Sequence, residues 1–218
     1  SWLMTDIDQH AEVAVLCRNR DLCPDTVRPL FERQIGFQYI PESYFPACTV
    51  EDGALWLHGH RYTAVLGDKA LFPDAAHPEV SALEPDCRCD PPQPMLRCAY
   101  FNKEGRACWL LVNEGNTPIK TRLTLPVDAP LCRYDLWNGQ PCTCPAERTA
   151  KGACLPLELP ARGSLLLFTC TARESEALPL PPTYLSLAAP AFSLADEDAA
   201  HLTKTYRATL QITATELQ

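Results

Sequence analysis

The side chains best suited to chemistry in this sequence are cysteines and histidines. Cys17 ends an apolar run ahead of a segment with helical spacing, and His58 and His60 follow later in the chain. A nucleophilic cysteine with a distant histidine partner would sit at such a strand-to-helix junction. No glycines flank Cys17 to shape a sharp turn, so we expect a buried structural thiol. We expect His58 and His60 to share one face of a strand, without a third metal ligand.

Two close cysteine pairs, Cys87/Cys89 and Cys142/Cys144, have the spacing Cys-x-Cys. Structural zinc sites commonly separate paired ligands by about two to four residues, so one intervening residue makes chelation awkward. We therefore expect no metal site and no cofactor, and we expect the twelve cysteines to be mainly reduced thiols. A zinc site is the first alternative. Disulfides come after it, because no export signal is visible.

Composition and charge exclude several classes of partner. The 218 residues include 21 prolines and 9 glycines, which disfavours long helices and suits strands joined by stiff loops. The formal net charge is -8 and the basic residues are scattered, so we expect no nucleic-acid partner. No apolar run approaches the ~20 residues of a membrane helix, so we expect no membrane partner. The first residues show no secretory signal, and we expect a cytoplasmic protein.

Residues 1–90 predict a small α/β unit. Apolar runs at residues 11–17 and 37–40 predict two buried strands, with a helix between them. Strand, helix and strand over this length form a βαβ unit, which requires a parallel sheet. Asp52-Gly53 predicts a hairpin turn, and residues 62–66 predict a further buried strand. A proline-rich segment then stands where further βα units would follow, so the unit is truncated.

The predicted helix has recognisable boundaries. Asp25 and Thr26 are suitable capping residues, Pro29 falls in the first turn, and Gly36 is a suitable stop. Its apolar face consists of Val27, Leu30, Phe31 and Ile35.

Residues 95–173 predict an antiparallel β-sandwich, because short strand-like stretches alternate with turn residues. These stretches are residues 96–101, 107–112, 119–125, 131–137, 153–159 and 164–171. Residues 174–218 begin with a stiff linker and contain one good strand around Tyr206–Ile212. That strand either joins the sandwich or begins a further domain that is cut off. The predicted fold class is thus α+β, a small truncated α/β unit followed by an antiparallel β-sandwich.

Seven segments carry a resemblance to a known family. They are residues 11–17, 30–40, 50–55, 60–66, 108–115, 134–139 and 160–168. In their order and in their pattern of apolar and turn residues, they resemble the C-terminal, non-catalytic part of large bacterial glycoside hydrolases related to family 2 and to the rhamnosidases of family 106. There, a flavodoxin-like domain similar to class I glutamine amidotransferases, but without their chemistry, precedes a β-sandwich, and the catalytic barrel lies upstream. A galactose-binding-like jelly roll often follows, so the resemblance implies that residues 174–218 could begin such a domain.

The resemblance implies an accessory segment of a glycoside hydrolase. Its partners would be the catalytic domain of the same parent chain, carbohydrate, and a second copy of the chain in a homo-oligomer. The sequence begins at Ser1 rather than Met, which we interpret as an internal cut. A free-standing carbohydrate-binding module and a zinc-stabilised interaction domain are the alternatives. A complete hydrolase is a weaker one, since a catalytic (β/α)8 barrel alone takes ~250 residues.

Glycoside hydrolysis requires two carboxyl groups across a sugar, roughly 5–10 Å apart. The acids nearest the expected strand ends are Glu42, Glu51, Asp52 and Asp68. Nothing in the sequence pairs any two of them, so we assign no catalytic residue.

Aromatic side chains are the candidates for contact with carbohydrate. Trp56, Tyr62 and Trp137 are candidates for stacking on sugar rings, and Trp109 is of the same type. Strands of this kind usually bury such rings, so a core position is the first expectation and we assign no carbohydrate-binding residue.

Overall fold

A computed structural model describes residues 8–9, 11–18, 24–135, 140–180, 184–187, 191–198, 203–209 and 212–215. The chain divides into two compact units, Ser1–Pro179 and Leu180–Gln218. It is an α+β protein in which strands predominate and sheets pack as in a β-sandwich, as the sequence predicts. The finer predicted division into residues 1–90, 95–173 and 174–218 stays a prediction.

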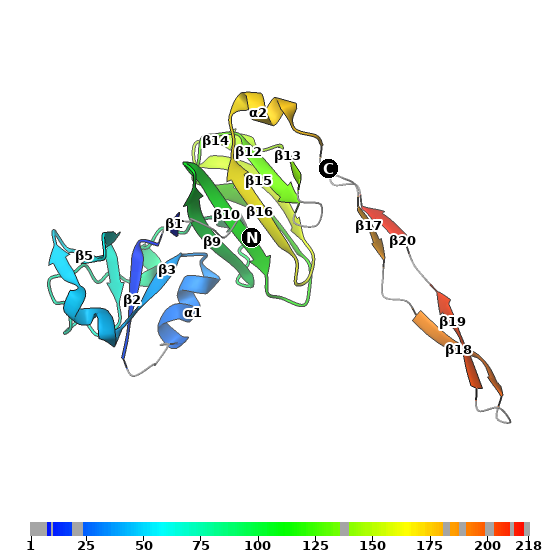
Figure 1. The fold of residues 1–218 in the computed structure, drawn as a ribbon, viewed down its shortest axis with the longest axis horizontal. Helices are drawn as coiled ribbons and strands as arrows, with labels where there is room; N and C mark the ends of the chain where they lie inside the picture. Colours follow the sequence, from blue (N-terminus) through cyan, green and yellow to red (C-terminus); the bar gives the residue numbers. More distant parts are fainter. Residues whose placement is uncertain are drawn as a thin grey trace. The chain divides into compact units, whose positions relative to one another are not determined.

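A three-stranded parallel sheet forms the centre of the first part of unit 1 (Figure 1). β2 (Val13–Cys17) lies between β3 (Phe37–Pro41) and β7 (Ala64–Leu66). Helix α1 (Pro24–Glu32) connects β2 to β3 and completes the predicted βαβ unit. Every residue of β2 is buried, as expected for a central parallel strand that is covered on both faces.

The two faces of this sheet pack against different elements. On one face, Val27 and Leu30 of α1 pack with Val13 and Val15 of β2. On the other face, Leu16 packs with the apolar side chains of a hairpin region. The elements of that region are β4 (Thr49–Glu51), β5 (Ala54–Leu57), β6 (His60–Tyr62) and the 3-10 helix η2 (Glu42–Ala47).

The hairpin between β4 and β5 confirms the predicted turn. Asp52 and Gly53 both have positive φ, 50° and 76°, which the tight turn of a two-residue hairpin requires. The single strand predicted over residues 62–66 is wrong. Tyr62 ends β6, which pairs antiparallel with β5, whereas Ala64 begins β7, which pairs parallel with β2.

Helix α1 ends earlier than the sequence predicts. Its last residue is Glu32, and Gln34 rather than Gly36 takes the left-handed conformation that stops the helix (φ 56°). Pro29 lies inside the helix, not in its first turn. Phe31 is 39% exposed, so it is not part of the buried face.

Two antiparallel sheets form the second part of unit 1 (Figure 1). The six-stranded sheet has the order β1-β9-β10-β16-β12-β13, and the four-stranded sheet has the order β14-β15-β11-β8. Side chains from both sheets, among them Trp109, Leu111, Leu123 and Leu155, share one buried core. The strands of the six-stranded sheet are β1 (Asp8–Gln9), β9 (Leu96–Lys103), β10 (Arg106–Asn113), β12 (Leu131–Asp135), β13 (Gln140–Cys144) and β16 (Ser164–Thr169). Those of the other sheet are β8 (Arg88–Asp90), β11 (Ile119–Leu125), β14 (Glu147–Thr149) and β15 (Gly152–Leu159).

All six predicted sandwich strands are present, with ends shifted by a few residues. Residues 136–137 of the predicted fourth strand lie outside the described residues. The four strands that the sequence did not predict are short or proline-containing. They are β1, β8, β13 and β14.

A disulfide bond joins Cys132 of β12 to Cys170, which directly follows β16. The Cα atoms are 6.3 Å apart, within the usual range of about 4.4–6.8 Å. This corrects the expectation that these two cysteines are reduced. Because 38 residues separate them in sequence, only the pairing of β12 with β16 brings them together.

A short helix, α2 (Ala172–Ala177), was also missed. Thr171 and Glu174 form a capping box, in which each side chain bonds the backbone N–H of the other residue. Arg106 of β10 forms an ion pair with Glu174, with 2.6 Å between Nη2 and Oε1. The Thr-x-x-Glu spacing was visible in the sequence as a helix start.

Unit 2 consists of two antiparallel strand pairs in its described part (Figure 1). β17 (Tyr184–Leu187) pairs with β20 (Ile212–Thr215), and β18 (Ala191–Asp198) pairs with β19 (Thr203–Thr209). The strand predicted around residues 206–212 is therefore divided between β19 and β20. These strands belong to neither sandwich sheet. No helix in the described part of the chain is long and apolar enough to cross a membrane.

Gly152 is a position where a side chain should not be tolerated. Its φ is +118°, and a Cβ there would meet the carbonyl oxygen of Leu125 and lie 2.9 Å from the backbone nitrogen of Val127. Gly105 also has positive φ (+77°), but a Cβ there meets nothing within 4 Å. In urea unfolding, Gly105→Ala should cost roughly 1–2 kcal/mol, and Gly152→Ala clearly more. Equal losses would contradict the close approach at Gly152.

The Cys132–Cys170 bond should stabilise unit 1. We expect a reductant to lower the free energy of unfolding by about 2–4 kcal/mol, because the bond restricts the unfolded chain. A Cys132→Ala/Cys170→Ala variant should not respond to reductant, whereas Cys48→Ala, which alters a half-buried free thiol, should respond like the wild type. Alkylation of both cysteines without prior reduction would argue against the bond.

Candidate functional site

The aromatic residues predicted to contact sugars lie in different environments. Tyr62 is only 2% exposed and its hydroxyl donates a hydrogen bond to Gln38 Oε1, so its ring has no open face. Trp56 is half-buried on β5. Trp137 lies outside the described residues, and Trp109 is 1% exposed in the sandwich core. The structure does not bring the three described rings, those of Trp56, Tyr62 and Trp109, together, and sugar contact by Trp56 stays a prediction.

The acids considered from the sequence do not form a catalytic pair. Glu42, Glu51, Asp52 and Asp68 are all exposed. Asp68 interacts with Arg18 at 3.6 Å, and Glu51 and Asp52 flank the β4–β5 turn. They are solvated acids of loops and turns, as their sequence context indicated.

Cys17 and the two histidines are likewise separate. Cys17 is 5% exposed within the apolar cluster on the α1 face of the sheet, and its thiol lies 3.6 Å from the carbonyl oxygen of Val15. His58 lies in the turn between β5 and β6 and contacts the ring of Tyr44, whereas His60 begins β6. The expectation that both histidines lie on one strand face is therefore wrong, because the chain reverses between them.

Three cysteine thiols lie close together inside the sandwich. Cys87 is hydrogen-bonded to Cys89 and to Cys98. The bond with Cys89 lowers the pKa of Cys87. The bond with Cys98 and burial raise it, and the result lies well above the ordinary value. The Cys87 bond and burial also raise the pKa of Cys89, and burial raises that of Cys144 to about 11. Protonated thiols are poor metal ligands. Among the described residues, no group of three or more Cys, His, Asp or Glu side chains could hold a metal ion.

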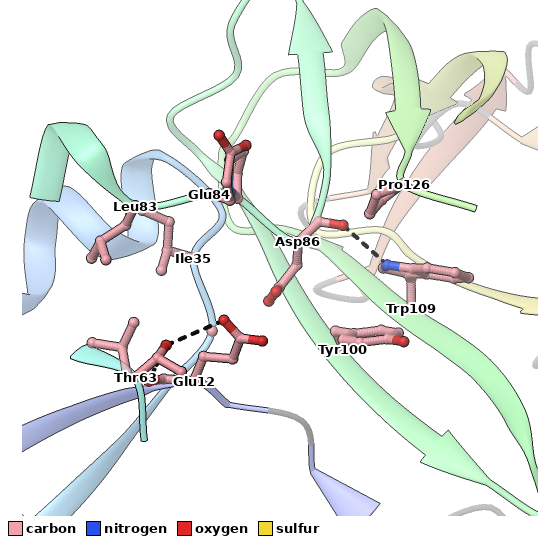
Figure 2. A pocket seen from close by; sticks show the side chains of 12 residues that line it. Glu12, Ile35, Thr63, Leu83, Glu84, Asp86, Tyr100, Trp109 and Pro126 are labelled. Carbon is pink, nitrogen blue, oxygen red and sulfur yellow. Dashed lines mark hydrogen bonds between the residues drawn. The ribbon is translucent and has the colours of Figure 1, made fainter. Parts of the chain in front are cut away.

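One cavity of about 200 Å³ lies where the parallel sheet meets the sandwich (Figure 2). The sheet contributes residues that directly precede its three strands: Glu12 before β2, Gly36 before β3 and Thr63 before β7. Parallel strands start at the same edge of a sheet, so these residues lie together at the amino edge. Residues 83–86 connect the two parts and form another wall. Tyr100 of β9, Trp109 of β10 and Pro126 come from the sandwich.

Glu12 is held in place by Thr63. The backbone N–H of Thr63 donates to the Glu12 carbonyl at 2.9 Å, and its hydroxyl donates to Glu12 Oε2 at 3.3 Å. Because Thr63 is the residue at which the chain passes from β6 to β7, the position of the Glu12 carboxyl group follows from the strand arrangement.

Asp86 is fixed through its backbone. Its N–H donates to the carbonyl of Gln34 at 2.8 Å, and its own carbonyl accepts from the indole Nε1 of Trp109 at 3.1 Å. Gln34 is buried, and its side-chain amide donates to the carbonyls of Leu96 at 3.0 Å and Gln93 at 3.1 Å. These bonds fix the main chain at Asp86.

The carboxyl group of Asp86 points toward that of Glu12 (Figure 2). Burial is the main reason that its pKa rises to about 7, and the charge of Glu12 adds to the rise, while a hydrogen bond from the Gly36 backbone opposes it. The Oδ2 atom of Asp86 is buried and has no hydrogen-bond partner in the structure. A buried carboxyl group near neutral pKa in a cavity is a common feature of functional sites.

An aromatic pair closes the sandwich side of the cavity. The rings of Tyr100 and Trp109 stack with centroids 5.1 Å apart and an interplanar angle of 24°. Burial and the neighbouring Asp86 raise the pKa of Tyr100. The site thus combines two carboxyl groups with aromatic and aliphatic walls, which suits a small ligand that presents hydrogen-bond donors.

The sequence analysis missed this cavity for a specific reason. It sought acids near strand ends, and open α/β sheets usually bind ligands at the carboxyl ends of their strands. Glu12 lies at the opposite edge, and Asp86 lies in the proline-rich connection. An acid directly before a buried strand was a visible signal, but its partner 74 positions further on was not.

The comparisons with known proteins concern the fold. No family model and no curated protein sequence matches the chain. A solved rhamnosidase from Novosphingobium sp. PP1Y is similar, with 11% identity and a TM-score of 0.54. The match covers 83% of this chain and 24% of the rhamnosidase, so the chain spans about a quarter of that protein.

Two further solved structures show weaker partial similarity. A β-galactosidase from Bacillus circulans sp. alkalophilus has 17% identity and a TM-score of 0.25, over 41% of this chain and 10% of its own. α-Galactosidase I from Mortierella vinacea has 20% identity and a TM-score of 0.28, over 42% and 25%. The rhamnosidase is a glycoside hydrolase, the broad class that the sequence resembles.

Asp86 should make the stability of the protein depend on pH. Its pKa is higher in the folded state than the ordinary 3.8, so its contribution is fully present below about pH 4 and is lost as pH rises toward 7. The loss is at most about 4 kcal/mol, since the side chain is partly exposed. Asp86→Asn should therefore be more stable than wild type at pH 8 and equal to it near pH 4, measured by urea unfolding.

Asp74→Asn, at an exposed acid outside the cavity, is the matched control and should keep the wild-type pH profile. An unchanged profile in Asp86→Asn would contradict the assigned titration.

Proposed function

We propose that this chain is a non-catalytic accessory segment of a glycoside hydrolase that acts on carbohydrate. In this proposal the catalytic domain belongs to the same parent chain and lies upstream. The observation that carries it is the match with the rhamnosidase, which extends over 83% of this chain but only 24% of that enzyme. This chain has the fold of one part of a much larger glycoside hydrolase. That correspondence favours an accessory role beside a separate catalytic domain.

The order of the folded parts also supports the proposal. A parallel sheet with one helical crossover precedes an antiparallel β-sandwich, and both belong to one compact unit. The parallel sheet would be the truncated flavodoxin-like domain, with strand order β3-β2-β7. The hydrogen bonds of Gln34 and Asp86 across their boundary would allow the two parts to act as one rigid spacer beside the catalytic domain.

The acidic cavity does not suggest sugar cleavage. Glycoside hydrolysis requires room for a sugar and its leaving group between two carboxyl groups. The cavity holds about 200 Å³, below the roughly 300–1,000 Å³ of typical ligand pockets. Space for one ring, but not for two linked rings, favours binding over hydrolysis.

A cytoplasmic location is part of the proposal. Disulfides are rare in reducing compartments, so the Cys132–Cys170 bond provides a direct test of it. Trapping of thiols before lysis of the source cells should find these two cysteines reduced if the parent enzyme is cytoplasmic, and bonded if it is exported.

The non-catalytic role can be tested with aryl glycosides. We expect the purified chain to hydrolyse nitrophenyl rhamnoside, galactoside and xyloside no faster than a Glu12→Gln/Asp86→Asn variant. A wild-type rate that exceeds the rate of the variant would place catalysis in the cavity and overturn the proposal.

The parent-chain part of the proposal has its own test. The gene should encode a catalytic domain in frame before Ser1, and removal of residues 1–179 from the full protein should lower the thermal stability of that domain. A start codon directly before Ser1 would contradict it.

A further inference from the structure

The cavity between the parallel sheet and the sandwich has a composition that calls for a ligand. Among the described residues that line it, none is a lysine, arginine or histidine. Of the three acids in this described lining, Glu12 and Glu84 are exposed, and Glu84 forms an ion pair with Arg88. Glu12 and Asp86 therefore face each other without a basic side chain among the described lining residues (Figure 2).

The acceptor capacity of these two carboxyl groups is not filled by the protein. Glu12 Oε2 receives one hydroxyl hydrogen bond from Thr63, and Asp86 receives one from the Gly36 backbone. Asp86 Oδ2 is buried and has no partner in the structure. Buried polar atoms in folded proteins nearly always have partners, so an unpartnered carboxyl oxygen beside a cavity indicates a missing donor.

The remaining walls are apolar and small in extent. Val13, Ile35, Leu83 and Pro126 provide aliphatic surface, and Tyr100 provides the edge of a stacked aromatic pair. A cavity of about 200 Å³ with two facing carboxyl groups and several apolar lining residues fits one small amphipathic ring.

We propose that this cavity binds a single neutral sugar ring, whose neighbouring hydroxyl groups bond to the carboxyl groups of Glu12 and Asp86. The apolar C–H face of the ring lies against Ile35 and Leu83. The inference deepens the proposed function, on which it rests for the class of ligand, by naming the site on the accessory segment that holds carbohydrate.

The protonation of the site favours hydroxyl groups over an ammonium group. With a pKa of about 7, Asp86 is partly protonated at neutral pH, so the pair offers one proton donor together with several acceptors. A hydroxyl group donates and accepts, and so complements both. An ammonium group only donates, so it would leave the carboxyl proton of Asp86 without an acceptor.

The test uses the full chain with L-rhamnose, D-galactose and D-xylose as probes. Their binding is followed by isothermal titration and by the indole N–H resonance of Trp109, which reports on the cavity through its bond to Asp86. We expect at least one sugar to bind at millimolar concentration and to shift this resonance. Glu12→Gln and Asp86→Asn should each weaken that binding by at least about tenfold, because each replaces a carboxyl oxygen that accepts from a sugar hydroxyl group by an amide group that donates.

Two controls separate binding from side effects. Asp74→Asn alters an exposed acid outside the cavity and should bind like the wild type. Asp86→Asn keeps the shape of the side chain, and its fold is checked by the dispersion of the other indole resonances. D-Glucosamine serves as the ammonium-bearing probe and should bind no better than the neutral sugars.

Three results would overturn the inference: no shift of the Trp109 resonance with any sugar, equal binding by Asp86→Asn, or binding of D-glucosamine alone. None of them affects the proposed accessory role, which depends on the hydrolysis and gene tests. Conversely, the gene could lack an upstream catalytic domain while the chain still binds sugar at this cavity. That result would support the proposed binding site and contradict the accessory role.

Discussion

The peptide groups of Asp86 connect the two cores of the first unit. The N–H group bonds to Gln34 just beyond helix α1, and the carbonyl bonds to Trp109, a fully buried residue of the sandwich. Gln34 adds its own side-chain bonds to the backbone around Leu96. Gln34 and Trp109 are buried, so the loss of one of their bonds would leave a buried polar group without a partner. The relation between parallel sheet and sandwich, and with it the shape of the cavity, depends on this junction.

This junction also explains the unusual acid. A carboxylate normally avoids a poorly solvated site by rotating its side chain or by moving its backbone toward water. At Asp86 both backbone groups are engaged, and the side chain points toward Glu12 instead of away from it. The raised pKa follows mainly from the burial of this side chain, at a position whose main chain is held by both of these bonds. In natural proteins, locally unfavourable interactions of this kind occur at functional sites, where favourable interactions elsewhere compensate for them.

The parts of the fold that follow from local patterns could be predicted, and the junction could not. In β11 apolar and polar residues alternate, because only one face of the strand is buried. In β2 the apolar run is unbroken, because both faces are buried. The end of α1 was misjudged, since Gln34 stops the helix while serving contacts with residues about sixty positions away. Asp86 in a proline-rich loop has no periodicity at all. Its role arises only when two separately predictable parts meet.

The position of the cavity follows from the same reasoning. In open α/β sheets, loops at the carboxyl ends of the strands form the ligand site, because helices begin there and strand order can leave a crevice. Here the parallel sheet has only three strands, and its amino edge is the one that faces the sandwich. A reduced α/β unit cannot build a crevice of its own, but its amino edge supplies Glu12, Gly36 and Thr63 to a cavity whose other wall belongs to the sandwich. The candidate site is therefore a property of the fused pair, and neither part would form it alone.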